Sequence, residues 1–342
     1  MIDLPVIHWG AERLQQQLAP WLPDLSVEVV HRTSSTNTTL LERARATANG
    51  PVDEADVQML ARMPEQTYAR AHVQAQVQVR RSVESGAFGR RAVDLQPCLL
   101  IAEHQSAGRG RQGRMWQSIA GASLTFSLGL PLTVPDWSGL SLAVGVAIAD
   151  ALDVTAVDAP SPHIGLKWPN DLWLMDGPLA SAPRGRKLGG VLIETVAAGH
   201  RRGGAVNEPA NDPARSKRLV IVGIGLNVLP FDTVEANTGF ASLSELDPAL
   251  SAPDALARIA LPLVNALQRF ERDGFAAFAE RFAARDLLRG RTVRTTLPEV
   301  PEGVARGVSA QGALRVQSTA GLVNVTSGEV SVRPLQSTGA AC

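Results

Sequence analysis

The sequence predicts an α+β fold, in which a mixed β-sheet packs against helices and a small β-barrel follows at the C-terminal end. Strand-like apolar runs are mixed with helical patterns over residues 1–288. Short alternating segments separated by turn dipeptides follow at 291–334. The 342 residues are 45% hydrophobic and 19% charged, which is typical of a globular chain with more than one domain. We therefore expect a larger domain at 1–288, a second domain at 289–335 and a tail at 336–342.

The N-terminal elements are predicted from residue periodicity. Residues 11–19 are expected to form a short helix, and 27–30 a strand that ends in the polar run 33–37. Another helix is expected to begin at Thr38. Residues 46–96 contain few large apolar side chains, so they cannot bury enough surface to offset the entropy of ordering them. We therefore expect a solvated insertion there.

The central part is predicted to consist mainly of strands. Ser138 is the expected N-cap of an amphipathic helix that ends near Leu152. The segments 177–185 and 197–215 are rich in small residues and turn formers, which indicates surface loops. Strands are expected at 99–102, 122–130, 165–168, 188–194 and 219–227.

Two helices are predicted before the barrel. Pro253 lies in the first turn of a long helix that begins after Ser251, and Pro262 is expected to bend or break this helix. A second helix is expected at 275–288, before Gly290. Turns between the barrel strands are expected at 302–303, 311–312, 320–321 and 327–328.

Charge and cysteine content exclude several classes of protein. The 33 basic and 33 acidic residues cancel, which argues against a globally basic nucleic-acid-binding protein. The two cysteines, Cys98 and Cys342, are too few for a disulfide framework or a cysteine-based zinc site. No signal peptide and no apolar run of membrane length is found, so a cytoplasmic protein without membrane association is expected.

Four segments contain residues suited to binding an anion. The Gly/Arg loop, GRGRQGR at 108–114, alternates glycines that allow close approach with arginines that bind carboxylates or phosphates. It is also compatible with a solvated loop or an RGG-like nucleic-acid segment. The other three are KWPND at 167–171, KLGGVLIE at 187–194 and GIGLN at 223–227, and each can also be explained as an ordinary turn or strand end.

Lysine is scarce in this chain, which strengthens the interpretation of two of these segments as binding sites. Lys167, Lys187 and Lys217 are the only lysines among 33 basic residues, and two of them begin motifs. A lysine close to an aspartate, as in KWPND, suits a phosphate and a divalent cation. No P-loop, complete dinucleotide-binding fingerprint or nucleophile elbow accompanies these segments.

Taken in order, the segments resemble the biotin–protein ligase family. The match includes Ser35–Asn37, EHQSA at 103–107 and Trp116, besides the four motifs. The resemblance implies a biotin/lipoate ligase-like catalytic domain and an SH3-like C-terminal domain. It implies a biotin–[biotin carboxyl-carrier protein] ligase that uses ATP, biotin and Mg²⁺ to make biotinyl-5′-AMP. Biotin would then pass to a lysine of an acceptor domain, in a biotin carboxyl carrier protein or a biotin-dependent carboxylase.

The resemblance also implies roles for individual residues. Arg111 and Lys187 are the expected catalytic residues, and Asp171 is an expected magnesium ligand. Biotin is expected to contact Ser35, Thr36, Asn37, Gln105, Gly108, Arg109, Gly110, Arg111 and Lys187. ATP or the adenylate is expected to contact Arg111, Arg114, Trp116, Lys167, Asn170, Asp171 and Asn227.

Departures from the family pattern leave alternatives open. The insertion at 46–96 and the enlarged loop after Asp171 have no assigned role, and the resemblance allows a homodimer. About 34 residues precede Ser35, too few for a winged helix-turn-helix domain, so operator DNA binding is not expected. A lipoate ligase or octanoyl transferase is one alternative, but the acyl-transfer members need a placed cysteine nucleophile, and neither cysteine suits. A nucleic-acid-binding regulator is the other, and zero net charge disfavours it.

Overall fold

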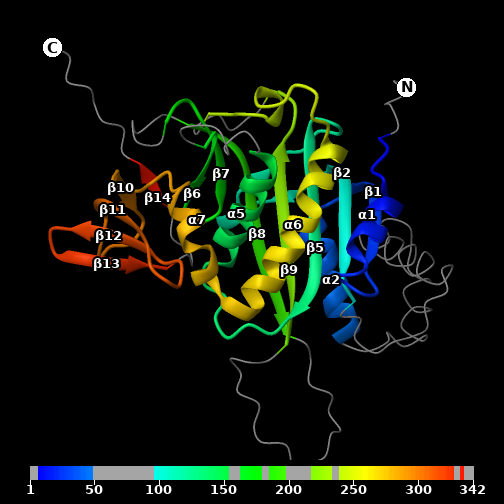
Figure 1. Ribbon diagram of the computed structural model, residues 1–342, viewed down its shortest axis with the longest axis horizontal. Coiled ribbons are helices and arrows are strands. Elements are labelled where there is room, and N and C mark those ends of the chain that lie inside the picture. Colours follow the sequence, from blue (N-terminus) through cyan, green and yellow to red (C-terminus); the bar gives the residue numbers. More distant parts are fainter. Residues whose placement is uncertain are drawn as a thin grey trace, which may run out of the picture.

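The computed structural model describes residues 7–48, 96–153, 162–178, 185–197, 217–232, 239–326 and 332–334. These residues form a seven-stranded sheet with packed helices and a five-stranded sheet at the C-terminal end (Figure 1). Nearly all of the insertion predicted at 46–96, and most of the loops predicted at 177–185 and 197–215, lie outside the described residues. In the described part of the chain, no helix has the length and hydropathy needed to cross a membrane.

The larger sheet has the strand order β1-β2-β5-β9-β8-β7-β6. Only β1 and β2 are parallel, and every other neighbouring pair is antiparallel. This arrangement confirms the predicted mixed sheet. The strands are β1 (Ser26–Thr33), β2 (Cys98–Gln105), β5 (Ser123–Leu132), β6 (Ile164–Lys167), β7 (Asp171–Met175), β8 (Gly185–Ala197) and β9 (Arg218–Asn227).

The two faces of this sheet are covered differently, because successive side chains of a strand point to opposite faces. Val220 and Val222 of β9 belong to the main core, formed with α1 (Ala11–Leu18), α5 (Leu140–Leu152) and α6 (Ala252–Asp273). Leu219 and Ile221 face the other way and pack against Leu40 and Leu41 of α2 (Thr36–Ala48). Beyond Ile221, the α2 face of β9 continues with two glycines, and this is where the site forms.

The structure corrects the prediction for α5. Its N-cap is Gly139 rather than Ser138. The helix is not amphipathic, because it lies between the sheet and α6 and is buried on nearly every side. Only a helix on the outside of a protein needs a polar face.

The two later helices also differ from prediction. Pro262 does not break α6, although proline inside a helix costs about 3 kcal/mol, because the apolar side of α6 is buried along its whole length. The helix predicted at 275–288 is a 3₁₀ turn followed by α7 (Ala279–Ala283). It ends early because the next residues pair with β6, where Leu166 bonds to the backbone of Arg285 and Leu287.

The C-terminal sheet is antiparallel, in the order β13-β12-β11-β10-β14. Turns occur within one residue of the predicted positions, at 310–311 and 319–320. The turn predicted at 302–303 is wrong, because these residues begin β11 and the chain reverses before them. The turn predicted at 327–328 lies outside the described residues. The strands are β10 (Thr292–Thr295), β11 (Glu302–Val308), β12 (Leu314–Ser318), β13 (Gly321–Val325) and β14 (Val332–Pro334).

The two sheets meet at the KWPND segment. The indole N–H of Trp168, which is fully buried, donates to the carbonyl of Gly312 at 3.0 Å. Gly312 lies in the turn between β11 and β12, and a β-carbon there would come within 2.7 Å of Gly139 Cα. The turn of the C-terminal sheet is therefore packed directly against the segment that leads into β7.

Asp286, at the same junction, makes stability depend on pH. Oδ1 accepts a hydrogen bond from the Leu288 N–H at 2.9 Å, while the buried Oδ2 has no hydrogen-bond partner among the described residues. Burial raises the pKa of this carboxyl from 3.8 to about 6. The folded protein therefore binds more protons than the unfolded chain between these two values, and its stability falls as pH rises through that window.

We expect Asp286→Asn to increase the free energy of unfolding at pH 8 by about 1 kcal/mol, since it removes a buried charge. The decline in stability between roughly pH 4 and 6 should flatten as well. Urea denaturation at a series of pH values measures both effects. The same decline in both proteins would contradict the assignment.

Candidate active site

The candidate site lies on the α2 face of the sheet, where the central strands carry small side chains. A β-carbon at Gly223 would overlap the side-chain amide of Asn37, and one at Gly225 would overlap the ring of Trp116. The two glycines therefore allow the start of α2 and the Gly/Arg loop to lie directly on β9. Residues aligned across β5, β9 and β8 are Ser127, Gly223 and Leu192 in one row and Thr125, Gly225 and Gly190 in the next.

A cluster of uncharged polar side chains occupies the end of the site next to α2. Asn37 Oδ1 accepts from Ser127 Oγ at 2.6 Å, and Nδ2 donates to the Leu192 carbonyl at 3.3 Å. The N–H and hydroxyl of Thr36 donate to Gln105 Oε1 at 2.7 and 3.2 Å. We call Ser35, Thr36, Asn37, Gln105 and Ser127 the polar cluster; all five are buried.

Ser35 has a different position from the other members. Its Oγ accepts from the Thr38 N–H at 3.5 Å, and its carbonyl accepts from the Thr39 N–H, so Ser35 is the N-cap of α2. The Ser35–Asn37 motif thus combines the N-cap of α2 with two side chains, those of Thr36 and Asn37, that contact strands of the larger sheet.

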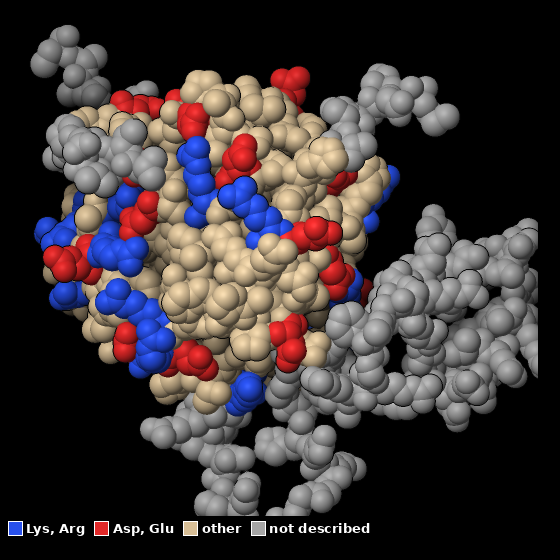
Figure 2. Space-filling model, turned by 45° about the vertical axis from the view of Figure 1, so that its right-hand side comes forward, with Lys and Arg blue, Asp and Glu red and all other residues tan. Residues whose placement is uncertain are grey.

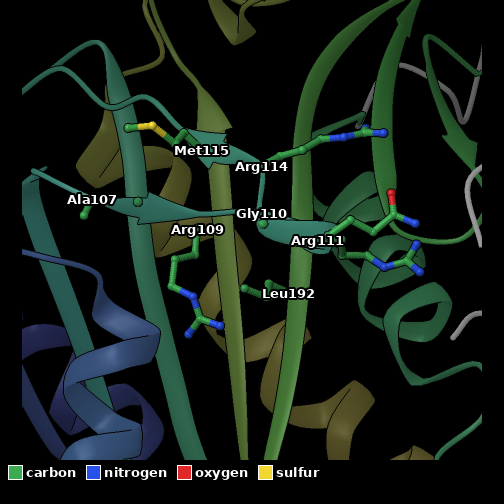
Figure 3. A pocket seen from close by; sticks show the side chains of 10 residues that line it. Ala107, Arg109, Gly110, Arg111, Arg114, Met115 and Leu192 are labelled. Carbon is green, nitrogen blue, oxygen red and sulfur yellow. The ribbon is translucent and has the colours of Figure 1, made fainter. Parts of the chain in front are cut away.

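The Gly/Arg loop folds back as a hairpin over this face. It consists of β3 (Gly108–Arg109), a 3₁₀ turn (Arg111–Gly113) and β4 (Met115–Trp116). With Leu192 of β8 it lines a cavity of about 790 Å³, within the roughly 300–1,000 Å³ typical of ligand sites (Figure 3). Gly108 and Gly110, predicted biotin contacts, both line this cavity.

Trp116 closes the site on the side of Gly225. Its buried indole N–H has no hydrogen-bond partner among the described residues. The ammonium group of Lys187 lies 6.0 Å from the Trp116 ring centroid. The ring therefore connects the loop to the charged part of the site.

Charged side chains gather at the other end, around Asp171. Asp171 Oδ1 lies 2.8 Å from Lys187 Nζ, and Oδ2 lies 3.6 Å from Lys167 Nζ. Arg111 donates to Asn170 Oδ1 at 3.4 Å, and Asn170 Nδ2 donates to the Val191 carbonyl at 2.8 Å. We call Arg111, Arg114, Lys167 and Lys187 the cationic cluster.

The pKa shifts in this cluster follow from burial and charge. Burial acts to raise the pKa of Asp171, but Lys187 and Lys167 hold it below its usual value. Burial, helped by the positive charges of Lys187 and Arg114, lowers the pKa of Lys167. Burial also lowers the pKa of Arg111. With one carboxylate among four cations, the cluster favours an anionic ligand.

The predicted magnesium site at Asp171 does not fit this geometry. Both carboxylate oxygens face lysines, so a cation at Asp171 would have to displace one of them. The described residues also contain no group of three or more His, Cys, Asp or Glu side chains able to hold a metal. A magnesium contact at Asp171 stays a prediction that these contacts do not favour.

Asn227 is buried at the end of β9. Its side-chain amide donates to the carbonyls of Lys187 at 3.3 Å and Ala241 at 3.0 Å. It therefore joins the start of KLGGVLIE to the chain that follows β9, and its predicted nucleotide contact stays a prediction.

Two residues of the site were not singled out from the sequence. Ser127 is one of three polar residues that alternate with apolar ones at the start of β5, so the sequence does not distinguish it from Ser123 and Thr125. Glu194 stood out only as the residue that caps the far end of KLGGVLIE. Its carboxylate accepts from Asn37 Nδ2 at 2.9 Å and pairs with Arg109 at 3.1 Å.

Comparisons with known proteins agree with one another. The profile of the biotin/lipoate A/B protein ligase family matches residues 95–207, and that of the biotin protein ligase C-terminal domain matches 289–333. A biotin--[acetyl-CoA-carboxylase] ligase from Mycobacterium tuberculosis is 34% identical over 245 residues, covering 69% of this chain and 79% of the relative. The bifunctional ligase/repressor BirA of Escherichia coli is 31% identical, covering 68% of this chain and 65% of the relative.

Among solved structures, the biotin protein ligase of Aquifex aeolicus in complex with biotin and ATP has a similar fold. It superposes with a TM-score of 0.56 at 22% identity, covering 90% of this chain and 99% of that one. This similarity concerns the fold and confirms the predicted combination of a mixed sheet with a small C-terminal sheet.

Proposed function

The chain belongs to the biotin–protein ligase family, and from that premise we propose that it ligates biotin to a lysine of a carrier protein in two ATP-dependent steps. One observation carries the proposal: an uncharged polar cluster and a cationic cluster flank the same cavity. Asn37 of the polar cluster bonds to Leu192, which lines the cavity, and Arg111 and Arg114 of the cationic cluster line it themselves. Biotin has a neutral ring system and a terminal carboxylate, and ATP brings phosphates. The two ends of the site match this distribution of charge.

In the first step, a biotin carboxylate oxygen attacks the α-phosphorus of ATP. The bond to the β-phosphate breaks, so that biotinyl-5′-AMP forms and pyrophosphate leaves. Two anions must approach each other, and fixed cations offset their repulsion. We assign Lys187 and Arg111 to the reacting groups, because both contact the KWPND segment, Lys187 at Asp171 and Arg111 at Asn170. Arg114 and Lys167 would hold the phosphates.

In the second step, the acceptor lysine attacks the acyl carbon of the mixed anhydride as a neutral amine. The bond to AMP breaks, and the amine loses its proton as the amide forms. Water would destroy the anhydride before this transfer. The Gly/Arg loop lies over the cavity and is placed to shield it.

An acyl-transfer enzyme with a cysteine nucleophile fits the structure less well. Cys98 begins β2, at the opposite end of that strand from the Gly/Arg loop. Burial raises the pKa of its thiol to about 12, whereas a nucleophilic cysteine needs a low pKa. Cys342 lies outside the described residues.

A nucleic-acid-binding regulator would use a continuous basic surface. On the face drawn in Figure 2, basic and acidic side chains of the described residues are interspersed. The face drawn there therefore offers no continuous basic surface for a nucleic acid.

The identity of the acceptor, the need for magnesium and the oligomeric state belong to the same proposal. The acceptor would be a biotin carboxyl carrier protein or a biotin-dependent carboxylase, and magnesium would arrive with the phosphates of ATP. A homodimer is a further proposal, which light scattering with and without biotin and ATP would test.

The activity is tested with the purified protein, biotin, ATP, Mg²⁺ and a biotin-acceptor domain. We expect the mass of the acceptor to increase by one biotinyl group, and the increase to require both ATP and the acceptor lysine. Reactions with lipoate or octanoate in place of biotin serve as matched controls. An increase with lipoate but not with biotin would overturn the proposal.

A further inference from the structure

Glu194 has a position that the proposed reaction does not yet explain. It lies on β8, two residues after Leu192 and on the same face, opposite Ile221 of β9. Its side chain is 22% exposed and has two partners on different elements. One is the amide of Asn37 at the start of α2, and the other is the guanidinium of Arg109 in the Gly/Arg loop. A negatively charged side chain is unexpected in a site for anionic ligands, so the presence of Glu194 requires an explanation.

Through Asn37, Glu194 determines the orientation of the polar cluster. Asn37 Nδ2 donates to Glu194 Oε2 at 2.9 Å and to the Leu192 carbonyl at 3.3 Å, which leaves Oδ1 to accept from Ser127. Because all three contacts are made, the amide is held in one orientation. Ser127 Oγ also lies 2.6 Å from Thr36 Oγ1, so the hydroxyl that is bonded to Asn37 is in direct contact with the neighbouring member of the cluster.

Through its ion pair with Arg109, Glu194 neutralises one of the positive charges of the Gly/Arg loop. Figure 3 shows the Arg109 side chain pointing away from those of Arg111 and Arg114. Arg109 pairs with Glu194 at 3.1 Å and donates to Thr38 Oγ1 at 3.4 Å. The pair has no net charge, so the end of the cavity next to the polar cluster is electrostatically neutral. The two other arginines of the loop, Arg111 and Arg114, face the end at which the cationic cluster lies.

We propose that Glu194 is a positioning residue for biotin, which acts through Asn37 and Arg109 without touching the ligand. This inference rests on the proposed function, because a neutral, oriented polar end is what the uncharged ring system of biotin requires. Glu194 fixes the hydrogen-bonding pattern of that end and holds the first residues of the loop against the sheet. Its effect is therefore confined to biotin binding, separate from ATP and from the chemical step.

The test is calorimetric titration of the full-length protein with biotin in the absence of ATP, followed by steady-state adenylation. For Glu194→Ala we expect biotin affinity to fall about tenfold, with a matching rise in KM for biotin. KM for ATP and kcat should stay within about twofold of wild type. Glu194→Gln keeps an acceptor for Asn37 and should recover affinity to within about threefold of wild type.

Glu302→Ala is the matched control, since Glu302 forms an exposed pair with Arg294 at 3.6 Å in the C-terminal sheet. It should bind biotin as wild type does. Wild-type biotin affinity in Glu194→Ala, or a loss in Glu194→Ala confined to kcat or to ATP, would overturn the role of Glu194. If the unaltered protein bound no biotin at all, the proposed function itself would fail.

Discussion

Replacing Lys187 with alanine is expected to slow formation of biotinyl-adenylate by roughly a hundredfold or more, an increase of about 2–4 kcal/mol in the activation free energy. The ammonium group stands 2.8 Å from Asp171 and 6.0 Å from the centroid of the Trp116 ring, within the cationic cluster. Its loss removes a cation from the point where two anions must meet. It also leaves Asp171 with Lys167 as its remaining lysine partner, so the negative charge of Asp171 is less well neutralised. Both changes make the site less favourable for anions.

The measurement is pyrophosphate release with biotin and ATP, alongside a thermal denaturation curve. The side chain of Lys187 is 29% exposed, so we expect the melting temperature to change little. Lys217→Ala is the matched control, because Lys217 is exposed, precedes β9 and lies outside every motif. Wild-type rates in Lys187→Ala would show that the catalytic assignment is wrong.

The elements that the sequence revealed best are those with strong local patterns. Most strands of the larger sheet lie within a few residues of their predicted positions, because each is a short apolar run. β7 was missed, since no strand was expected between 168 and 188, although the turn proposed within KWPND does join β6 to β7. The helix predicted to reach Leu288 ends at Ala283, because pairing of the following residues with β6 outweighs helix propensity.

The site could be predicted only in part, for a related reason. Motifs identify residues one segment at a time, and they located both the Gly/Arg loop and the cationic cluster. Ser127 and Glu194 reach Asn37 from 90 and 157 residues away along the chain. Which strand residues face the ligand depends on the register of three strands, and a single sequence does not contain that information.

The glycines of GIGLN show the same difference between motif and structure. In the sequence, Asn227 is the residue of interest, and the glycines indicate only an incomplete dinucleotide-binding fingerprint. In the structure, Gly223 and Gly225 are the spaces into which Asn37 and Trp116 fit. The motif therefore contributes to the site chiefly because its two glycines have no side chains, which leaves room for Asn37 and Trp116.

Gly225→Ala should consequently impair the site more than its small size suggests. The added β-carbon would overlap Trp116 Cε2 and come within 2.7 Å of Cζ2 and Nε1. The Trp116 backbone is paired with Gly108 across the β3–β4 hairpin, so the ring must move while its backbone is held. Overpacking of this kind costs roughly 1–3 kcal/mol. Because the ring lies beside Lys187, we expect the cost to appear in nucleotide binding.

We expect KM for ATP to rise roughly ten- to a hundredfold in Gly225→Ala, with a smaller change in biotin affinity, since the polar cluster lies one row away over Gly223. Gly129→Ala is a control in a neighbouring strand of the same sheet. There the added carbon meets a methyl group of Leu40 at 3.3 Å, which can shift slightly. Trp116→Ala combined with Gly225→Ala completes the argument: once the ring is absent, the added methyl group has nothing to displace. The double variant should then be no worse than Trp116→Ala alone, and a full additive loss would place the effect of Gly225 elsewhere in the sheet.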